Sequence, residues 1–157
     1  MNKSKIKTYA VSLLIALGVG GVSALLTNMG MENYKMAEKP AFTPPDIVFP
    51  IVWTILFLLM GISSARIYLS PVSVHRSRGL LIYVLQLAAN FIWSLLFFNL
   101  QAYGLAFFWL IFLSVLILLM IIVFSKTDKI AAYLQIPYLL WVSFAGVLNY
   151  MVWMLNR

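Results

Sequence analysis

Residues 79–125 read GLLIYVLQLAANFIWSLLFFNLQAYGLAFFWLIFLSVLILLMIIVFS and contain no charged side chain. About 20 residues of apolar helix cross the hydrocarbon core of a bilayer, so this stretch is long enough for two crossings. The polar residues Asn99, Gln101 and Tyr103, followed by Gly104, interrupt it near the middle. We therefore predict a tight turn there between two transmembrane helices.

The composition of the whole chain is typical of a membrane protein. Of the 157 residues 64% are hydrophobic and only 10% are charged, with a mean hydropathy of +0.99. Apolar residues occupy both faces of the uncharged stretches, which favours helices over the alternating pattern of a barrel. We predict an all-α membrane protein, a bundle of five transmembrane helices forming a single domain of residues 1–157. The expected spans are about 8–28, 46–66, 79–99, 104–125 and 130–153.

Basic residues are distributed unevenly between the two sides of this topology. With five crossings, the N-terminal tail and the second and fourth loops share one side, which the positive-inside rule places in the cytoplasm. The N-terminus is therefore predicted to be cytoplasmic, and the net charge of +7 reports orientation rather than binding to nucleic acid. We expect a protein integral to the cell (plasma) membrane. The basic residues on the predicted cytoplasmic side are Lys3, Lys5, Lys7, Arg66, Arg76, Arg78, Lys126 and Lys129.

The N-terminal segment has two interpretations. Lysines followed by an apolar run are also the pattern of a signal peptide. However, the apolar run continues past Ala24, and Ala16, Gly20 and Ala24 recur every fourth residue, as in helices that approach another helix closely. We favour a retained and packed transmembrane helix.

The longest predicted loop, about residues 28–46, contains Glu32-Asn33-Tyr34 and three prolines close to its end. Proline fixes its own backbone and disfavours helix in the preceding residue, so we expect a stiff, non-helical segment. Pro44 and Pro45 then fall at the start of the second helix, where a missing N–H is harmless. We predict that this proline-rich first loop caps the outer end of the bundle. The simpler interpretation is a loop that only carries a helix-start signal.

Polar and large aromatic residues share single faces of three predicted helices. An amide without a partner is costly in hydrocarbon, so these side chains should face protein or a cavity. The topology brings the three faces together in the outer half of the bundle, which predicts an aromatic-walled pocket for a flat ligand. Helix–helix contacts and interfacial aromatic belts are the alternative. The shared faces are Gln86, Asn90, Trp93 and Phe97; Phe49 and Trp53; and Trp141, Ala145, Leu148 and Asn149.

Several kinds of chemistry are excluded by residue counts and positions. The chain has one histidine, His75, in a predicted loop, so two axial histidines for an intramembrane haem are missing. There is no cysteine and no cluster of metal-ligating residues, so we expect no metal site. All four acidic residues lie in predicted loops or at a span end, whereas a proton-coupled carrier is expected to hold one inside the bundle. We expect no required cofactor.

The order of several motifs resembles the tryptophan-rich sensory protein or translocator protein family (TspO/MBR), also called the peripheral-type benzodiazepine receptor family. Tyr34 and the segment Lys39-Pro40-Ala41-Phe42-Thr43-Pro44-Pro45, then Phe49, Trp53 and Met60-Gly61, are similar to its first loop and second helix. Gln86-Leu87-Ala88-Ala89-Asn90 with Trp93 and Phe97-Phe98 resembles its third helix. Pro137-Tyr138, Trp141, Phe144-Ala145, Leu148-Asn149-Tyr150 and Trp153 resemble its fifth.

This resemblance implies a homodimeric membrane protein that binds tetrapyrroles such as protoporphyrin IX and regulates porphyrin levels or a stress response. It also leaves two alternatives, a porphyrin or small-molecule transporter and a light-dependent porphyrin-degrading enzyme. For the porphyrin-degrading alternative, the resemblance implies Trp53 and Trp141 as catalytic residues, because they match the indoles implicated in light-dependent porphyrin breakdown. The ligand-binding residues that the resemblance implies are Tyr34, Pro44, Pro45, Trp53, Asn90, Trp93, Trp141, Phe144 and Ala145.

Three departures from the family pattern affect this transfer. Phe42 and Phe91 stand where tryptophan is common, so some indole contacts are lost. The cholesterol-recognition pattern needs a basic residue within about five positions of its tyrosine. Arg157 is too far from Tyr150 to meet it, so we predict no sterol binding. Trp109 stands where several relatives carry an acidic residue.

Overall fold

The computed structural model describes all 157 residues, and its regular structure is entirely helical. Five of its segments are long and apolar enough to cross a membrane, so the predicted fold class of a five-helix transmembrane bundle is confirmed and its environment is a lipid bilayer. The turn η1 continues α3, and α5 and α6 together make the fifth span. The elements are α1 (Lys3–Met36), α2 (Val48–Leu69), α3 (Val74–Ser94), the π-helical turn η1 (Leu95–Asn99), α4 (Tyr103–Ser125), α5 (Lys129–Tyr133) and α6 (Ile136–Leu155).

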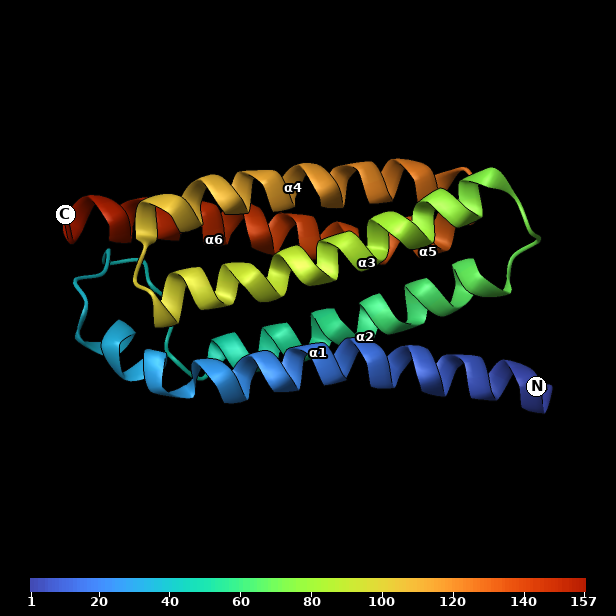
Figure 1. Cartoon of the computed structure of the whole chain (residues 1–157), viewed down its shortest axis with the longest axis horizontal. Coiled ribbons are helices and arrows are strands. Elements are labelled where there is room, and N and C mark those ends of the chain that lie inside the picture. Colours follow the sequence, from blue (N-terminus) through green and yellow to red (C-terminus); the bar gives the residue numbers. More distant parts are fainter.

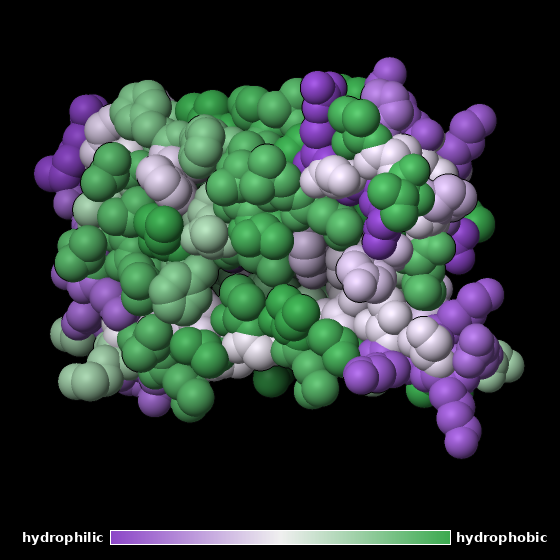
Figure 2. Space-filling view, turned by 45° about the vertical axis from the view of Figure 1, so that its right-hand side comes forward, coloured by the Kyte–Doolittle hydropathy of each residue, from purple (hydrophilic) through white to green (hydrophobic).

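The spans run up and down in one bundle (Figure 1). α1 packs against α2 on one side, α4 packs against α6 on the other, and α3 contacts both pairs. The loop Ala37–Ile47 and the C-terminus lie at one end, which we call the cap end. The N-terminus and the loops at 70–73 and 126–128 lie at the other, the basic end. Figure 2 shows hydrophobic side chains around the middle of the molecule and hydrophilic ones toward both ends, as a bilayer requires.

α1 extends further than the sequence analysis predicted. The first span was expected to end near residue 28, with Glu32-Asn33-Tyr34 in the loop, but the helix continues to Met36. The loop assignment of residues 32–34 was wrong, because the first proline of the segment is Pro40 and nothing before it breaks the helix. The connecting loop is therefore shorter, and Tyr34 is held on a helix.

Contacts with the end of the third span hold this last part of α1 in place. A Cβ at Gly30 would lie 2.5 Å from the Phe98 carbonyl oxygen, so the two backbones touch there. Asn99 Nδ2 also donates a hydrogen bond of 2.9 Å to the carbonyl oxygen of Leu26. The extended end of α1 is thus fixed as a wall beside η1, although most of α1 is lipid-facing.

The π-helical turn η1 decides which side chains end the third span. The amide of Leu100 bonds to the carbonyl oxygen five residues earlier at 3.0 Å, so one turn holds an extra residue. Phe97 and Phe98, adjacent in sequence, consequently both reach the interior. The predicted tight turn follows at residues 100–102, where Gln101 has a left-handed backbone with φ of 50°.

The fifth span is interrupted at Leu134 and Gln135, between α5 and α6. Pro137 accounts for the break, because it lacks an N–H and its ring clashes with the carbonyl four residues earlier. Asp128 caps α5 through a 3.0 Å bond from the backbone N–H three residues on. The same carboxylate pairs with Arg66 of α2 at 2.8 Å, which ties the two helices together at the basic end.

α1 and α2 approach each other through glycines. A Cβ at Gly61 would lie 2.9 Å from the Cα atom of Leu13, and one at Gly20 would lie 2.6 Å from the Phe57 ring. Ala16, one turn from Gly20, is completely buried. The small residues of α1 thus allow the close approach that their spacing predicted, in an environment where packing rather than the hydrophobic effect holds helices together.

We predict that Gly61→Ala lowers the free energy of unfolding by about 1–3 kcal/mol, because the new methyl group meets backbone that cannot move aside. The matched control is Gly21→Ala in α1, where a Cβ has nothing within 4 Å. This control should leave stability unchanged or raise it by up to about 1 kcal/mol. Thermal unfolding in detergent micelles, followed by circular dichroism, measures both, and equal melting temperatures for the two variants would contradict the prediction.

Candidate ligand-binding cavity

A cavity of about 500 Å³ lies in the cap-end half of the bundle, between α1, α2, α3 with η1, and α6. Its volume falls within the range of about 300–1,000 Å³ that is usual for small-molecule sites. The structure brings six of the nine predicted ligand residues into its wall. These six are Tyr34, Trp53, Asn90, Trp93, Trp141 and Ala145.

Pro44, Pro45 and Phe144 do not line the cavity. Pro45 is exposed, and both prolines belong to the loop that crosses the cap end. Their predicted place at the start of the second helix was wrong, because α2 begins only at Val48. Phe144 packs against Trp141 with ring centroids 5.3 Å apart, and against Phe42 of the loop at 6.4 Å. Phe144 therefore supports a wall residue and the loop from behind.

The first residues of the loop are held by hydrogen bonds to α6 and to α1. Asn156 at the end of α6 bonds to the backbone of Glu38 twice, accepting from its N–H at 3.0 Å and donating to its carbonyl oxygen at 2.8 Å. Lys39 Nζ donates to the carbonyl oxygens of Tyr34 and Lys35, at 3.0 and 3.1 Å, and so caps the end of α1. These bonds anchor the start of the loop, and its prolines restrict the backbone that follows.

The cavity opens between α1 and the start of α2, because its exposed lining residues lie there. The rim carries one cation, Lys35, which pairs with Glu32 at 3.2 Å, and a second carboxylate, Asp46, that forms no ion pair. A ligand can therefore place a charged group at the mouth while its apolar body is inside. The exposed lining residues are Ala24, Asn28, Glu32, Lys35, Asp46, Ile47 and Pro50.

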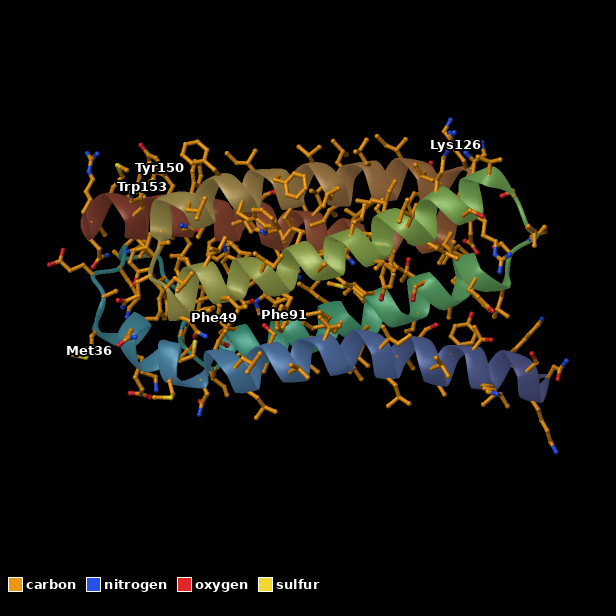
Figure 3. All side chains as sticks on the ribbon, in the orientation of Figure 1. Met36, Phe49, Phe91, Lys126, Tyr150 and Trp153 are labelled. Carbon is orange, nitrogen blue, oxygen red and sulfur yellow. The ribbon has the colours of Figure 1, made fainter.

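Aromatic rings from α1, α2, α3 with η1, and α6 form the cavity wall. Trp53 and Trp93 lie 6.3 Å apart at an interplanar angle of 33°, and Trp93 stacks on Phe97 at 5.4 Å. Phe49, labelled in Figure 3 at the start of α2, meets Trp141 of α6 edge to face at 5.9 Å. Such a wall offers both ring faces and ring edges, which suits a flat conjugated ligand.

Hydrogen bonds join α3 and α6 beside the cavity. Asn90 Nδ2 donates to the Tyr138 hydroxyl at 2.7 Å, and that hydroxyl donates to Gln86 Oε1 at 2.7 Å. The Trp93 indole donates to Asn149 Oδ1 at 3.1 Å. The buried amides predicted to face protein or a cavity thus bond to groups on neighbouring helices, chiefly Tyr138, Trp93 and the Tyr103 carbonyl oxygen.

Two donors in the cavity-lining residues have no partner within the protein. The hydroxyl of Tyr34 and the indole nitrogen of Trp141 are both enclosed and form no hydrogen bond. A buried polar group without a partner costs about 1–3 kcal/mol. A ligand with acceptor oxygens can recover this cost, so these groups are candidates for orienting one.

A model of the TspO/MBR family matches residues 10–154. The chain belongs to the TspO/MBR family. It is 35% identical to the Tryptophan-rich protein TspO of Chlorobaculum tepidum over 99% of both chains. It is 31% identical to the Translocator protein of Sus scrofa over 94% of this chain and 90% of that one. Identity to the Tryptophan-rich sensory protein of Cereibacter sphaeroides is also 31%, over 80% and 77% of the two chains. The resemblance drawn from the motifs is confirmed.

In this TspO/MBR protein, α1 supplies a wall that the sequence analysis did not assign to the site. Ser23, Thr27 and Met31 line the cavity together with Gly20 and Ala24. Their spacing of three and four residues places them on one helical face, a signal that was present in the sequence. It was interpreted only as a surface for helix packing, because the small residues allow close approach as well.

We predict that Tyr138→Phe lowers the free energy of unfolding by about 1–3 kcal/mol, because two buried amide groups lose the hydroxyl that joins them. Tyr133→Phe on the same span is the control, since its side chain is exposed and its hydroxyl forms no hydrogen bond within the protein. Thermal unfolding in micelles compares the two variants. A melting temperature of Tyr138→Phe equal to that of the control would show that the hydroxyl contributes nothing.

Proposed function

We propose that this TspO/MBR protein is a membrane sensor that binds a tetrapyrrole such as protoporphyrin IX in the cap-end cavity, and that it regulates porphyrin levels or a stress response. The observation that carries this proposal is the aromatic cavity itself, about 500 Å³ in volume and walled by Trp53, Trp93 and Trp141. A tetrapyrrole is flat, conjugated and mainly apolar, so it gains by stacking on indoles and by leaving water.

The rim of the cavity supports the same proposal. Protoporphyrin IX carries carboxylates on one edge, and the exposed Lys35 at the mouth is a cation that can bind them in place of Glu32. The unpartnered Tyr34 hydroxyl and Trp141 indole are further donors in lining residues. In the proposed pose the carboxylates remain at the mouth and the ring lies between the indoles.

The setting of the protein is part of the proposal. Because the basic end holds most of the lysines and arginines, we propose that it faces the cytoplasm and that the cap end faces outward across the plasma membrane. A homodimer is proposed from the family resemblance.

We predict that protoporphyrin IX quenches the tryptophan fluorescence of the purified protein saturably. The double variant Trp53→Phe with Trp141→Phe should raise the dissociation constant roughly tenfold, because each lost indole contact contributes about 0.5–1.5 kcal/mol. Trp153→Phe is the matched control, since this indole lies outside the cavity against Phe107 and Tyr150. Unchanged affinity in the double variant would count against the site.

A second candidate function is light-dependent porphyrin degradation, with the bound porphyrin as photosensitiser and dioxygen as oxidant. It is favoured by one observation: Trp53 and Trp141, the indoles implied as catalytic by the resemblance, both line the cavity. Under illumination in air, porphyrin absorbance should then bleach faster with the protein than with detergent alone, and Trp53→Phe should slow the bleaching. Equal bleaching rates with and without protein, while binding persists, would leave the sensor as the function.

A further inference from the structure

Four buried side chains form a chain of hydrogen bonds that ends at the cavity. Gln86 Nε2 donates to the sulfur of Met60 at 3.9 Å, and the Tyr138 hydroxyl donates to Gln86 Oε1 at 2.7 Å. Asn90 Nδ2 donates to the Tyr138 oxygen at 2.7 Å. Each of these four side chains is at most 3% exposed, so water does not compete for their bonds.

The direction of this chain is set at its inner end. A thioether sulfur accepts a hydrogen bond weakly and cannot donate one, so Gln86 turns its NH₂ group toward Met60. Its oxygen then faces Tyr138, and the single hydroxyl proton of Tyr138 is used on that oxygen. The Tyr138 oxygen is left as an acceptor, which Asn90 meets with its NH₂ group. The reverse direction would place the Gln86 oxygen against the sulfur lone pairs and lose that contact.

The outer end of the chain is consequently an acceptor. Asn90 Oδ1 accepts no hydrogen bond from the protein and is not enclosed by it. Since Asn90 lines the cavity, this oxygen faces the cavity. Its neighbour Trp93 offers no N–H there, because its indole is bonded to Asn149. The carboxamide therefore presents a carbonyl oxygen to a ligand rather than an amide N–H.

We propose that Met60, which does not line the cavity, is a positioning residue that fixes this polarity and so makes the site select flat conjugated ligands with an accessible N–H donor. The proposal rests on the proposed function and, within the tetrapyrroles, favours open-chain ones, whose pyrrole N–H groups can reach an acceptor at the edge of the ligand. In a closed macrocycle the N–H groups point into the central hole, and in a metal complex all four nitrogens are occupied. The cavity also has no histidine to bind a metal, since His75 lies at the basic end. The selected feature is the N–H group, and the aromatic wall supplies the stacking common to all such ligands.

The test uses two probes of nearly the same shape, carbazole and 9-methylcarbazole, of which only the first has an N–H. The wild-type protein in micelles should bind carbazole about five- to tenfold more tightly, because only carbazole satisfies the Asn90 oxygen. Fluorescence anisotropy of each probe gives its dissociation constant. Protoporphyrin IX is titrated in parallel to measure binding to the cavity itself.

Three variants distinguish a positioning role of Met60 from a purely structural role in packing. Met60→Leu conserves volume but removes the sulfur, so the two directions of the hydrogen-bond chain become about equally populated. The ratio of the two dissociation constants should then fall by about half, to about three to five. Met120→Leu in α4 is the matched control, since Met120 is equally buried and forms no hydrogen bond, and it should keep the wild-type ratio. Asn90→Leu removes the acceptor itself and should reduce the ratio to about one.

Three outcomes decide between the proposals. A ratio near one in the wild type, or a full ratio retained in Met60→Leu, overturns the positioning role while protoporphyrin IX binding leaves the proposed function standing. If neither carbazole nor protoporphyrin IX binds, the ligand cavity fails and both proposals fall. Discrimination between the carbazoles without any protoporphyrin IX binding supports the donor-selective site and overturns the tetrapyrrole function.

Discussion

The hydrogen bond from Asn90 to Tyr138 joins α3 to α6 beside the cavity, and the geometry of the site depends on it. Inside a bilayer the hydrophobic effect does not press helices together, so close packing and buried polar contacts keep them in register. The parallel contact of Trp93 with Asn149 fixes the same two helices nearer the cap end. Together these two bonds fix the distance between α3 and α6, so that the aromatic side chains of the wall leave a cavity between them.

The opposite wall of the cavity is α1, which is held by close backbone contacts rather than by buried hydrogen bonds between side chains. α1 is the least buried span and is held by glycine contacts at Gly20, Gly30 and Gly61 and by the Asn99 bond to its backbone. Its extension to Met36, fastened by Lys39, turns a helix that faces mostly lipid into one side of a cavity. The mouth lies where this extension meets the start of α2. A ligand can thus enter beside α1 without disturbing the bonds between α3 and α6.

A few buried polar side chains have no hydrogen-bond partner in the protein. Most polar side chains within the spans bond across helices or to their own backbone, as the cost of an unpaired group in hydrocarbon demands. Tyr34 and Trp141 depart from this rule in the cavity wall, and Tyr83 and Gln135 depart from it away from the cavity. Departures from local consistency are expected at functional sites, where a ligand restores the missing contact. The Asn90 side-chain oxygen also lacks a partner in the protein, and a ligand with an N–H group can supply one.

The sequence by itself determined the fold class, because uncharged stretches of sufficient length must span a bilayer as helices, and it placed Trp53, Asn90 and Trp141 on faces that converge. It failed for residues 32–34, since the local pattern of charge and amide resembles a loop while only contacts with Phe98 and Asn99 show that α1 continues. It also predicted Pro44, Pro45 and Phe144 as ligand-binding residues. In the structure these three lie outside the cavity wall, with Phe144 packed behind Trp141. Only the tertiary structure showed that α1 lines the cavity. It also showed that Met60 accepts from Gln86 and so sets the direction of the hydrogen bonds that lead to Asn90. Helical spacing defines which residues share a face, but the partner of each donor and acceptor depends on how neighbouring helices are packed, and no single segment contains that information.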